Sequence, residues 1–185
     1  MGDKRTEIIP NREECLRLME RYGMLENIVA HSLEVNRVAL FLCTELNRRG
    51  QRIDSRLVEA ASLLHDISKT ECLRTKEDHT KAGCRLLREI GYEEVGEIVA
   101  QHVWLTGERT PEAVSEEEVV NYADKRVRHD QIVSLEERFQ DLKSRYGKSE
   151  KSIKYLAELE KMTLGVENKI FMILKMDPDD ILLFG

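Results

Sequence analysis

The chain has little that would interrupt a helix. Only three of its 185 residues are proline and ten are glycine, whereas 41% are hydrophobic and 35% are charged. Few helix breakers beside many apolar and charged residues favour a helix-rich globular protein. A chain of this length can bury one proper core. We therefore expect a single all-α domain.

Other absences exclude several classes of protein. No apolar run approaches the ~20 residues that span a membrane, and the charged residues 1–10 lack the apolar centre of a signal peptide. The net charge is -6 and no basic stripe is present, so we expect neither a nucleic-acid nor a membrane partner. The cysteines show no CxxC spacing. We therefore interpret them as reduced thiols in a cytoplasmic protein. They are Cys15, Cys43, Cys72 and Cys84.

Hydrophobic spacing and capping residues predict a series of helices. Apolar residues at intervals of three and four mark the buried faces, and polar residues suited to cap the helix starts are Asn11, Asp54, Asp78 and Ser115. The predicted helices cover residues 11–22, 27–49, 54–67, 79–90 and 93–104, a helix from 115 with no break before Gly147, and one or two helices within 149–175. Residues 69–77 are predicted to be a polar connection, and no alternating run is long enough for a strand.

These elements divide the chain into three parts. Residues 1–10 are predicted to be a loose arm, and residues 11–148 a helical domain whose motifs lie within 27–127. Residues 149–185 would add a C-terminal helical segment that packs on the same domain and closes with a short turn from Pro178.

The most informative stretch is an apolar run that ends in adjacent histidine and aspartate residues, His65 and Asp66. Neighbours on a helix point about 100° apart, so both side chains can converge on one point near the helix end. A nitrogen and a carboxylate suit zinc, iron, manganese and similar ions. Burial of Asp66 without a partner would be costly, and a metal or a hydrogen-bond donor would remove that cost. The plainer alternative is a helix C-terminus with two polar caps.

Further titratable residues lie on apolar helix faces or at helix ends. His31 and His102 share faces with core residues, and Asp124 follows one turn after a buried valine. His79 falls in a first helical turn, where the helix dipole favours the neutral, metal-binding imidazole. For a histidine such as His31, a hydrogen-bonded core residue is the alternative. His129 lies in a charged run, and we leave it out of the set.

This pattern resembles the HD superfamily of metal-dependent phosphohydrolases. His31, then His65 and Asp66 together, then Asp124 follow in the order of the family signature, over roughly residues 27–127. The five residues from His65 read His-Asp-Ile-Ser-Lys, similar to the family's His-Asp-Ile-Gly-Lys form with serine in place of glycine. Asp124 follows an alanine, as the family's last aspartate does. The resemblance implies an all-α fold that presents its ligands from a helical bundle.

The resemblance also implies a ligand set for two ions. One ion would be held by His31, His65, Asp66 and Asp124, and the other by His79, His102 and the second oxygen of Asp66, because two intermediate histidines supply the second site of two-metal members. Two ions ~3.5–4 Å apart suit in-line displacement at phosphorus with water as the nucleophile. Histidine and carboxylate without thiolate fit Fe, Mn, Co, Zn or Ni without separating them.

Basic residues near this set suggest contacts to substrate. We predict Asp66 and Lys69 as catalytic residues, with Lys69 holding a phosphate as a point charge; a solvated lysine is the alternative. Arg74 and Lys81 fringe the same region and are predicted to guide an anionic substrate, although an exposed face would also explain them. Lys125 is interpreted as an exposed charge beside Asp124.

The function that these residues indicate is hydrolysis of a small phosphate ester or anhydride, most simply a nucleotide or dinucleotide. The resemblance includes diadenosine-tetraphosphate hydrolases and cyclic-dinucleotide phosphodiesterases, but the Gly-Tyr-Pro motif of the latter is absent. One alternative is a di-iron oxygenase of a small polyol or phosphonate, which uses the same six ligands. Another is a non-catalytic module that senses a nucleotide. The sequence leaves the substrate, the metal and the oligomeric state open.

Overall fold

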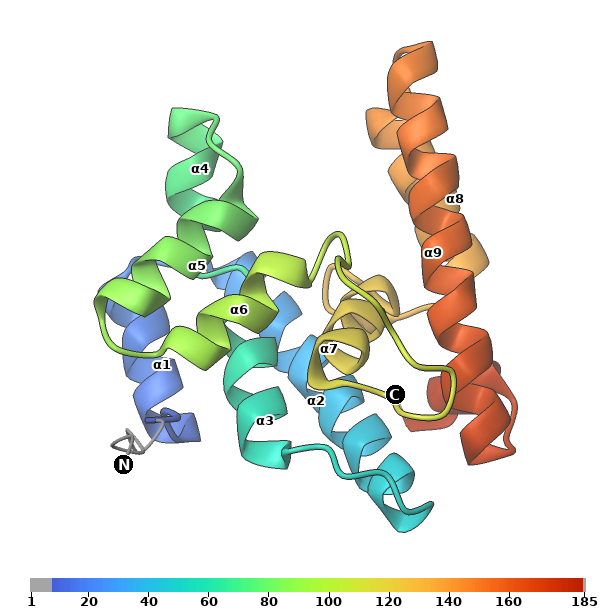
Figure 1. Cartoon of the computed structure of the whole chain (residues 1–185). Helices are drawn as coiled ribbons and strands as arrows, with labels where there is room; N and C mark the ends of the chain where they lie inside the picture. The colour runs from blue at the N-terminus through green and yellow to red at the C-terminus, as the bar shows by residue number, and fades with distance from the viewer. Residues whose placement is uncertain (1–7, 185) are drawn as a thin grey trace.

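Helices make up nearly all of the regular structure in this computed structural model, which describes residues 8–184, with side chains to Leu182 (Figure 1). The elements are α1 (Arg12–Arg21), α2 (Glu26–Arg48), α3 (Ser55–Leu64), α4 (Lys69–Thr75), α5 (His79–Glu89), α6 (Glu93–Gln101), α7 (Glu116–Lys125), β1 (Val127–Arg128), β2 (Gln131–Ile132), α8 (Leu135–Tyr146), α9 (Glu150–Leu174) and the 3-10 helix η1 (Pro178–Phe184). The predicted all-α class is confirmed. Most of the predicted arm, residues 1–7, lies outside the described residues.

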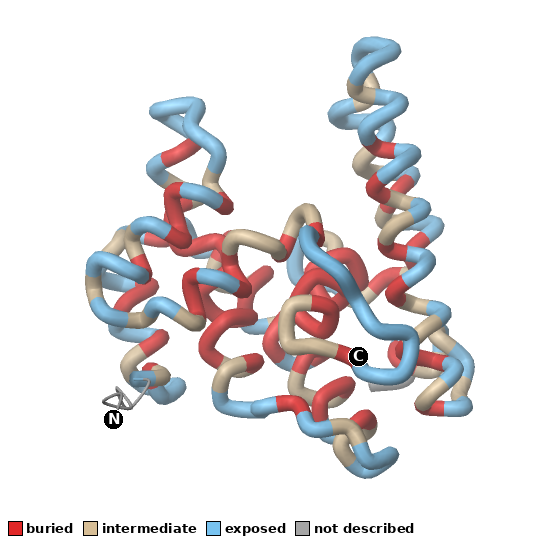
Figure 2. Tube along the Cα trace, viewed as in Figure 1, coloured by how far each residue is buried: buried red, intermediate tan, exposed pale blue. Residues whose placement is uncertain are grey.

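The centre of the molecule is formed by α2, α3, α6 and α7. α2 packs against α3 and α7, and α6 packs against the same two helices. The apolar positions of α2 that recur at three and four are buried, as this spacing predicts for a helix that faces a core. Figure 2 shows the buried residues concentrated in these helices, while the far ends of α4 and of the α8–α9 pair are largely exposed.

Helix starts agree closely with the predicted caps. The side chains of Asn11, Asp54, Asp78 and Ser115 each accept a backbone N–H from the first turn of α1, α3, α5 and α7. At α7 the glutamate three residues after the cap completes a capping box. These local bonds fix where each helix begins, and therefore how far along it a given side chain lies.

The prediction of a polar connection over residues 69–77 is wrong. Residues Lys69–Thr75 form α4, which ends at Lys76 in the left-handed conformation, with φ of 64°. Only Cys72 is buried in this helix. The seven residues hold only two apolar side chains, Cys72 and Leu73, at adjacent positions. They therefore give no helical period, which explains why hydrophobic spacing does not indicate the helix.

The helix predicted from 115 to Gly147 is also interrupted. α7 ends at Lys125, and β1 pairs antiparallel with β2 in a short hairpin. His129, at the turn, has a φ of 58°. α8 then starts with its own capping box at Ser134. The hairpin strands have two residues each, too few for an alternating pattern to show in the sequence.

The C-terminal residues form one long helix, α9, followed by η1. α9 packs against α8, α7 and α2, and α8 and α9 run side by side away from the body (Figure 1). Arg126, fully buried just after α7, holds η1 in place by donating to the carbonyl oxygen of Pro178 at 2.9 Å. None of the helices over residues 8–184 is both long and apolar enough to cross a membrane.

Candidate metal centre

The six predicted ligands come from five helices and meet in one region. His31 lies on α2, His65 and Asp66 at the end of α3, His79 at the start of α5, His102 directly after α6, and Asp124 on α7. All are buried except His79, whose side chain is 27% exposed. Their convergence follows from the packing of α2, α3, α6 and α7, which brings helix segments distant in sequence together.

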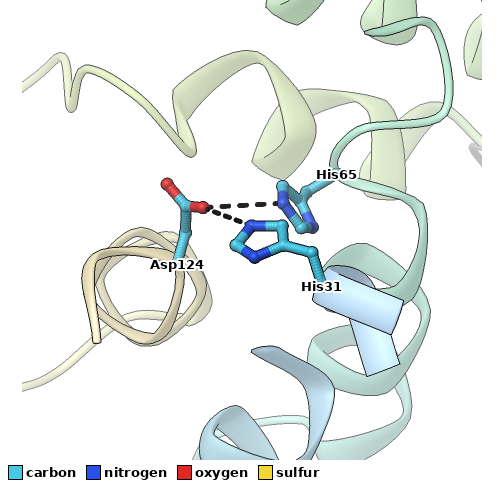
Figure 3. Close-up of side chains that lie close together, drawn as sticks. All are labelled: His31, His65 and Asp124. Atoms are coloured by element: carbon cyan, nitrogen blue, oxygen red, sulfur yellow. Dashed lines mark hydrogen bonds and ion pairs between the residues drawn. The ribbon is translucent and has the colours of Figure 1, made fainter. Parts of the chain in front are cut away.

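The first group of side chains is His31, His65 and Asp124 (Figure 3). Oδ1 of Asp124 lies 3.0 Å from Nε2 of His31 and 3.6 Å from Nε2 of His65. The two rings approach edge to face with centroids 5.3 Å apart. Two imidazole nitrogens and a carboxylate oxygen therefore face one small volume, as ligands of a divalent ion do.

The second group is His65, Asp66 and His102, with His79 beside it. The two oxygens of Asp66 face different partners. Oδ2 lies 3.4 Å from Nε2 of His65, while Oδ1 lies 3.4 Å from Nε2 of His79 and 3.7 Å from Nε2 of His102. The carboxylate thus stands between the two groups, in the position expected of a ligand shared by two ions.

Three of the histidines are oriented by backbone carbonyl groups. The Nδ1 atom of His31 lies 2.8 Å from the carbonyl oxygen of His129. The Nδ1 atom of His65 lies 2.8 Å from the carbonyl oxygen of Ser62, and that of His102 lies 2.7 Å from the carbonyl oxygen of Val99. A carbonyl oxygen only accepts, so Nδ1 must donate. In the neutral ring Nε2 then keeps its lone pair and faces the centre, which is the usual arrangement of a metal-binding histidine.

Two buried polar atoms in the centre have no hydrogen-bond partner within the described part of the chain: Nε2 of His65 and Oδ1 of Asp66. Buried polar atoms without a partner are costly and uncommon. Both atoms point at the other ligands, and a divalent ion would satisfy both. The residues present therefore fit a metal site.

Charge and burial set the ionisation of the ligands. Burial raises the pKa of Asp66, but the charges of His65 and Lys69 outweigh it and the net pKa lies well below its ordinary value. The pKa of Asp124 is likewise low, because Lys125 and His31 outweigh burial. Burial lowers the pKa of His102 to about 3. The carboxylates are therefore charged and His102 is neutral near neutral pH, the states in which each binds a metal.

His79 and His65 differ in how strongly they hold a proton. Burial also lowers the pKa of His79, which keeps its imidazole neutral. Burial also lowers the pKa of His65, but the charges of Asp66 and Asp124 and the hydrogen bonds to Asp66 and Ser62 together outweigh it, and the net pKa is raised above 6.5. An ion that binds to His65 must therefore displace a proton that this ring retains more tightly than usual.

Two lysines lie against the carboxylates. Nζ of Lys69 is 2.6 Å from Oδ2 of Asp66, and its side chain is 40% exposed. Lys125 is buried and donates to Oδ2 of Asp124 at 2.7 Å and to the carbonyl oxygen of His102 at 3.0 Å. The interpretation of Lys125 as an exposed charge is wrong. The buried Asn121, one turn earlier on α7, donates to the same carbonyl oxygen. No sequence signal marks the burial of Lys125, because it depends on the packing of α6 beside α7.

Arg74 and Lys81, which the sequence suggests as guides for substrate, lie outside this group, and so does Trp104. Arg74 is exposed on α4 and paired with Glu71, and Lys81 is exposed on α5. Trp104, shortly after His102, is partly buried, stacks on Tyr155 of α9 and lines a groove of about 980 Å³ beside that helix. None of the six predicted ligands lines this groove.

Comparison with known proteins identifies relatives of this chain. Residues 28–129 match the family described as HD domain. An uncharacterized protein of Methanocaldococcus jannaschii is 29% identical over 70% of this chain and 83% of its own length. The tRNA (cytidine(56)-2'-O)-methyltransferase of Thermoplasma volcanium is 32% identical over 60% of this chain, and ribonuclease Y of Alkaliphilus metalliredigens 31% over 55%. The matches cover only 31% and 21% of those two proteins. No solved structure matches significantly.

Proposed function

The chain belongs to the HD-domain family, and from this premise we propose that it is a metal-dependent phosphohydrolase. The observation that supports the proposal most directly is the pair of unpartnered atoms, Nε2 of His65 and Oδ1 of Asp66, at the centre of a buried cluster of histidines and aspartates. Their chemistry is that of a site which is completed by a cation rather than by another side chain.

In this proposal the six residues bind two ions. His31, His65, Asp66 and Asp124 hold one, and His79, His102 and the second oxygen of Asp66 hold the other. Divalent ions bound there would lower the pKa of a water molecule so that it attacks phosphorus, and would neutralise charge on the phosphoryl oxygens. Iron, manganese, cobalt, zinc and nickel all suit this ligand set.

The remaining residues would orient the ligands and the substrate. Lys69 donates to Oδ2 of Asp66, and its side chain is still 40% exposed. An ammonium group has three donors, so the others would serve a phosphate. Lys125 donates both to Oδ2 of Asp124 and to the carbonyl oxygen of His102, and so links Asp124 to the end of α6. Positively charged groups thus hold both carboxylates in place before substrate arrives, so little reorganisation is needed during the reaction.

The proposed substrate is a small phosphate ester or anhydride, most simply a nucleotide. A phosphodiester of an oligonucleotide is a second candidate, because one relative is named a ribonuclease. The decisive experiment is a screen of phosphorylated metabolites, nucleotides and a short oligoribonucleotide with Mn²⁺, Co²⁺ and Fe²⁺, combined with metal analysis of protein purified without chelator. Phosphate release that depends on the metal supports the proposal. No release from any compound with any metal would contradict it.

The same preparation separates the alternatives. An oxygenase would contain two irons per chain, would change colour on exposure to air and would release no phosphate. A nucleotide-sensing module would bind nucleotides without turnover. Either result would replace the hydrolase proposal while leaving the metal site intact.

A further inference from the structure

Helix α9 carries a second regular row of residues besides the one that packs on the body. The buried row, with intervals of three and four, consists of Leu156, Leu159, Thr163, Val166, Ile170 and Leu174. A second row alternates strictly between intervals of three and four, and we call it the outer seam: Tyr155, Glu158, Met162, Gly165, Lys169 and Met172. None of these six residues is buried. Such spacing is the pattern with which one helix packs against another.

The outer seam forms one wall of the groove that Trp104 also lines. Five of its six residues line this groove of about 980 Å³, and the sixth, Tyr155, stacks on Trp104 with ring centroids 5.4 Å apart. Met172 is 79% exposed, and a Cβ atom at Gly165 would meet nothing beyond its own helix backbone within 4 Å. In Figure 1, α9 forms one edge of the molecule. The groove therefore offers an accessible apolar surface with room for a close approach at Gly165.

The charges along the groove are separated into an excess and a deficit. Nζ of Lys169 lies 2.9 and 2.7 Å from the two carboxylate oxygens of the buried Glu118, and Nε of Arg109 lies 4.0 Å from one of them. Two cations thus share one anion, which leaves an excess of positive charge. Glu158, about three turns earlier on the outer seam, is exposed and forms no ion pair among residues 8–184. It lies too far along the same helix to neutralise that excess.

The outer seam is complementary to itself when its direction is reversed. Apolar positions then face apolar or small ones, and the acid faces the base. Across a twofold axis between positions 163 and 164, the pairs are Tyr155 with Met172, Glu158 with Lys169, and Met162 with Gly165. Each pair occurs twice, because a twofold interface uses the same surface of both copies.

We propose that the groove is occupied by a second copy of this chain, and that two α9 helices pair antiparallel through their outer seams in a twofold symmetric dimer. Glu158 of each copy then neutralises the excess positive charge beside Glu118 of the other copy. The methionine at 162 fills the open space at Gly165 of the other copy. A single helix seam is a small interface, so we expect a reversible dimer with a dissociation constant of roughly 1–100 µM.

The first test measures the molar mass of the full chain by sedimentation equilibrium. The wild-type mass is expected to rise from 21.5 kDa toward twice that value as the concentration increases from roughly 1 to 300 µM. Met172→Glu places a carboxylate against Tyr155 and Glu158 of the other copy and should weaken association by about tenfold or more. Leu164→Glu is the matched control: it makes the same change at an exposed position of α9 outside the outer seam and should associate as the wild type does. Both variants should keep the wild-type circular dichroism.

The second test examines the register of the two helices. Ordinary and ¹⁵N-labelled protein are mixed, cross-linked with a zero-length carbodiimide and analysed by mass spectrometry. Glu158 and Lys169 lie roughly 16 Å apart along one helix, so a bond between them is expected only between copies, in peptides of mixed isotope content. The bond from Lys169 to Glu118 forms within one copy and is the internal control for the reactivity of the lysine.

Three results would overturn the proposal. The first is a wild-type protein that stays at 21.5 kDa up to roughly 300 µM, which would leave the groove to a helix of another protein. The second is a dimer that Met172→Glu leaves intact, because its interface would lie elsewhere. The third is a link from Lys169 to Glu118 without any link to Glu158 between copies. No ligand of the candidate metal centre lines the groove, so none of these results bears on the proposed hydrolase function.

Discussion

Two buried polar clusters lie at the end of α7, and they are built in opposite ways. Arg126 belongs to one, with the Tyr122 hydroxyl, Glu167 and the backbone of η1, and each nitrogen of its guanidinium group has an acceptor. Asp124, two residues earlier, belongs to the other, in which Nε2 of His65 and Oδ1 of Asp66 have no partner within residues 8–184. Burial is nearly the same in both, so burial alone does not distinguish them.

The difference lies in whether hydrogen bonding is complete. A polar cluster that closes on itself contributes to stability and to a unique packing, whereas one that leaves donors or acceptors unused awaits a ligand. This criterion assigns the Arg126 cluster to the fold and the histidine–aspartate cluster to function. The criterion can be tested by experiment, because it predicts that the two clusters respond differently to substitution.

The largest effect is expected for Asp66→Ala or His65→Ala. Each removes a ligand at the junction of the two candidate metal groups, so metal-dependent phosphatase activity should fall by roughly a thousandfold or more. Far-UV circular dichroism should remain close to that of the wild type. Glu89→Ala, which removes an exposed acid from α5, is the control and should keep full activity. Activity retained in either ligand variant would refute the assignment.

Arg126→Met should show the reverse behaviour. Removal of this guanidinium leaves the carbonyl oxygen of Pro178 without its donor and Glu167 without its paired cation. The free energy of unfolding measured in urea should therefore fall by about 3 kcal/mol or more. The protein that remains folded should bind metal as the wild type does. Arg128→Met, at a partly exposed position in β1, should change stability by less than about 0.5 kcal/mol. Equal stability of the two variants would contradict the structural role of Arg126.

The second ion can be tested through His79. Nε2 of His79 lies 3.2 Å from Nε2 of His102, at the more exposed edge of the centre. His79→Ala should therefore lose about one ion per chain by elemental analysis. His129→Ala is the matched control, because His31 uses the backbone carbonyl at position 129 rather than the side chain. An unchanged metal content in His79→Ala would reduce the site to a single ion.

Metal affinity should depend on pH mainly through His65. Its pKa is raised above 6.5 because the charges and hydrogen bonds of its neighbours, Asp66 first among them, together outweigh burial. A proton therefore competes with the ion at every pH below that raised pKa. The affinity for the metal should thus fall as the pH falls, by about tenfold per pH unit once His65 is protonated. The proton that is released on metal binding can be measured by calorimetry in buffers of different ionisation enthalpy. His102, with a pKa of about 3, should release no proton in the neutral range. A flat affinity between about pH 6 and 8 would contradict this ionisation scheme.

The smallest effects are expected for Arg74→Ala and Lys81→Ala. Both side chains are exposed, so any contribution to guiding an anionic substrate would be long-range. We expect a decrease of about two- to fivefold in kcat/KM at low ionic strength, which disappears in high salt. A decrease that persists in high salt would instead indicate direct contact with substrate.

Much of the fold follows from local signals in the sequence. Caps at Asp54, Asp78 and Ser115 and the apolar stripe of α2 locate those helices correctly, because capping and periodic burial act within a few residues. The same stripes draw attention to His31 and Asp124, since a polar residue on an apolar face requires a partner. The HD family itself is confirmed by the match over residues 28–129.

The features that could not be predicted from the sequence depend on tertiary contacts. α4 has one buried residue and hence no period, and the hairpin that interrupts the helix expected from 115 is held by bonds such as that from Val133 N–H to the Arg126 carbonyl. The burial of Lys125 is visible only once α6 packs beside α7. The carbonyl of His129, which orients His31, has no side-chain signature at all.

The contacts of Arg126 extend beyond the stretch that resembles other HD domains. That stretch ends at residue 129, yet the guanidinium within it reaches forward to Glu167, Pro178 and Asp179. A fragment of residues 28–129 alone would leave the guanidinium group of Arg126 without these partners, at the end of α7, the helix that also carries Asp124. We therefore expect the smallest stable fragment to be longer than the shared signature and to include α9 and η1.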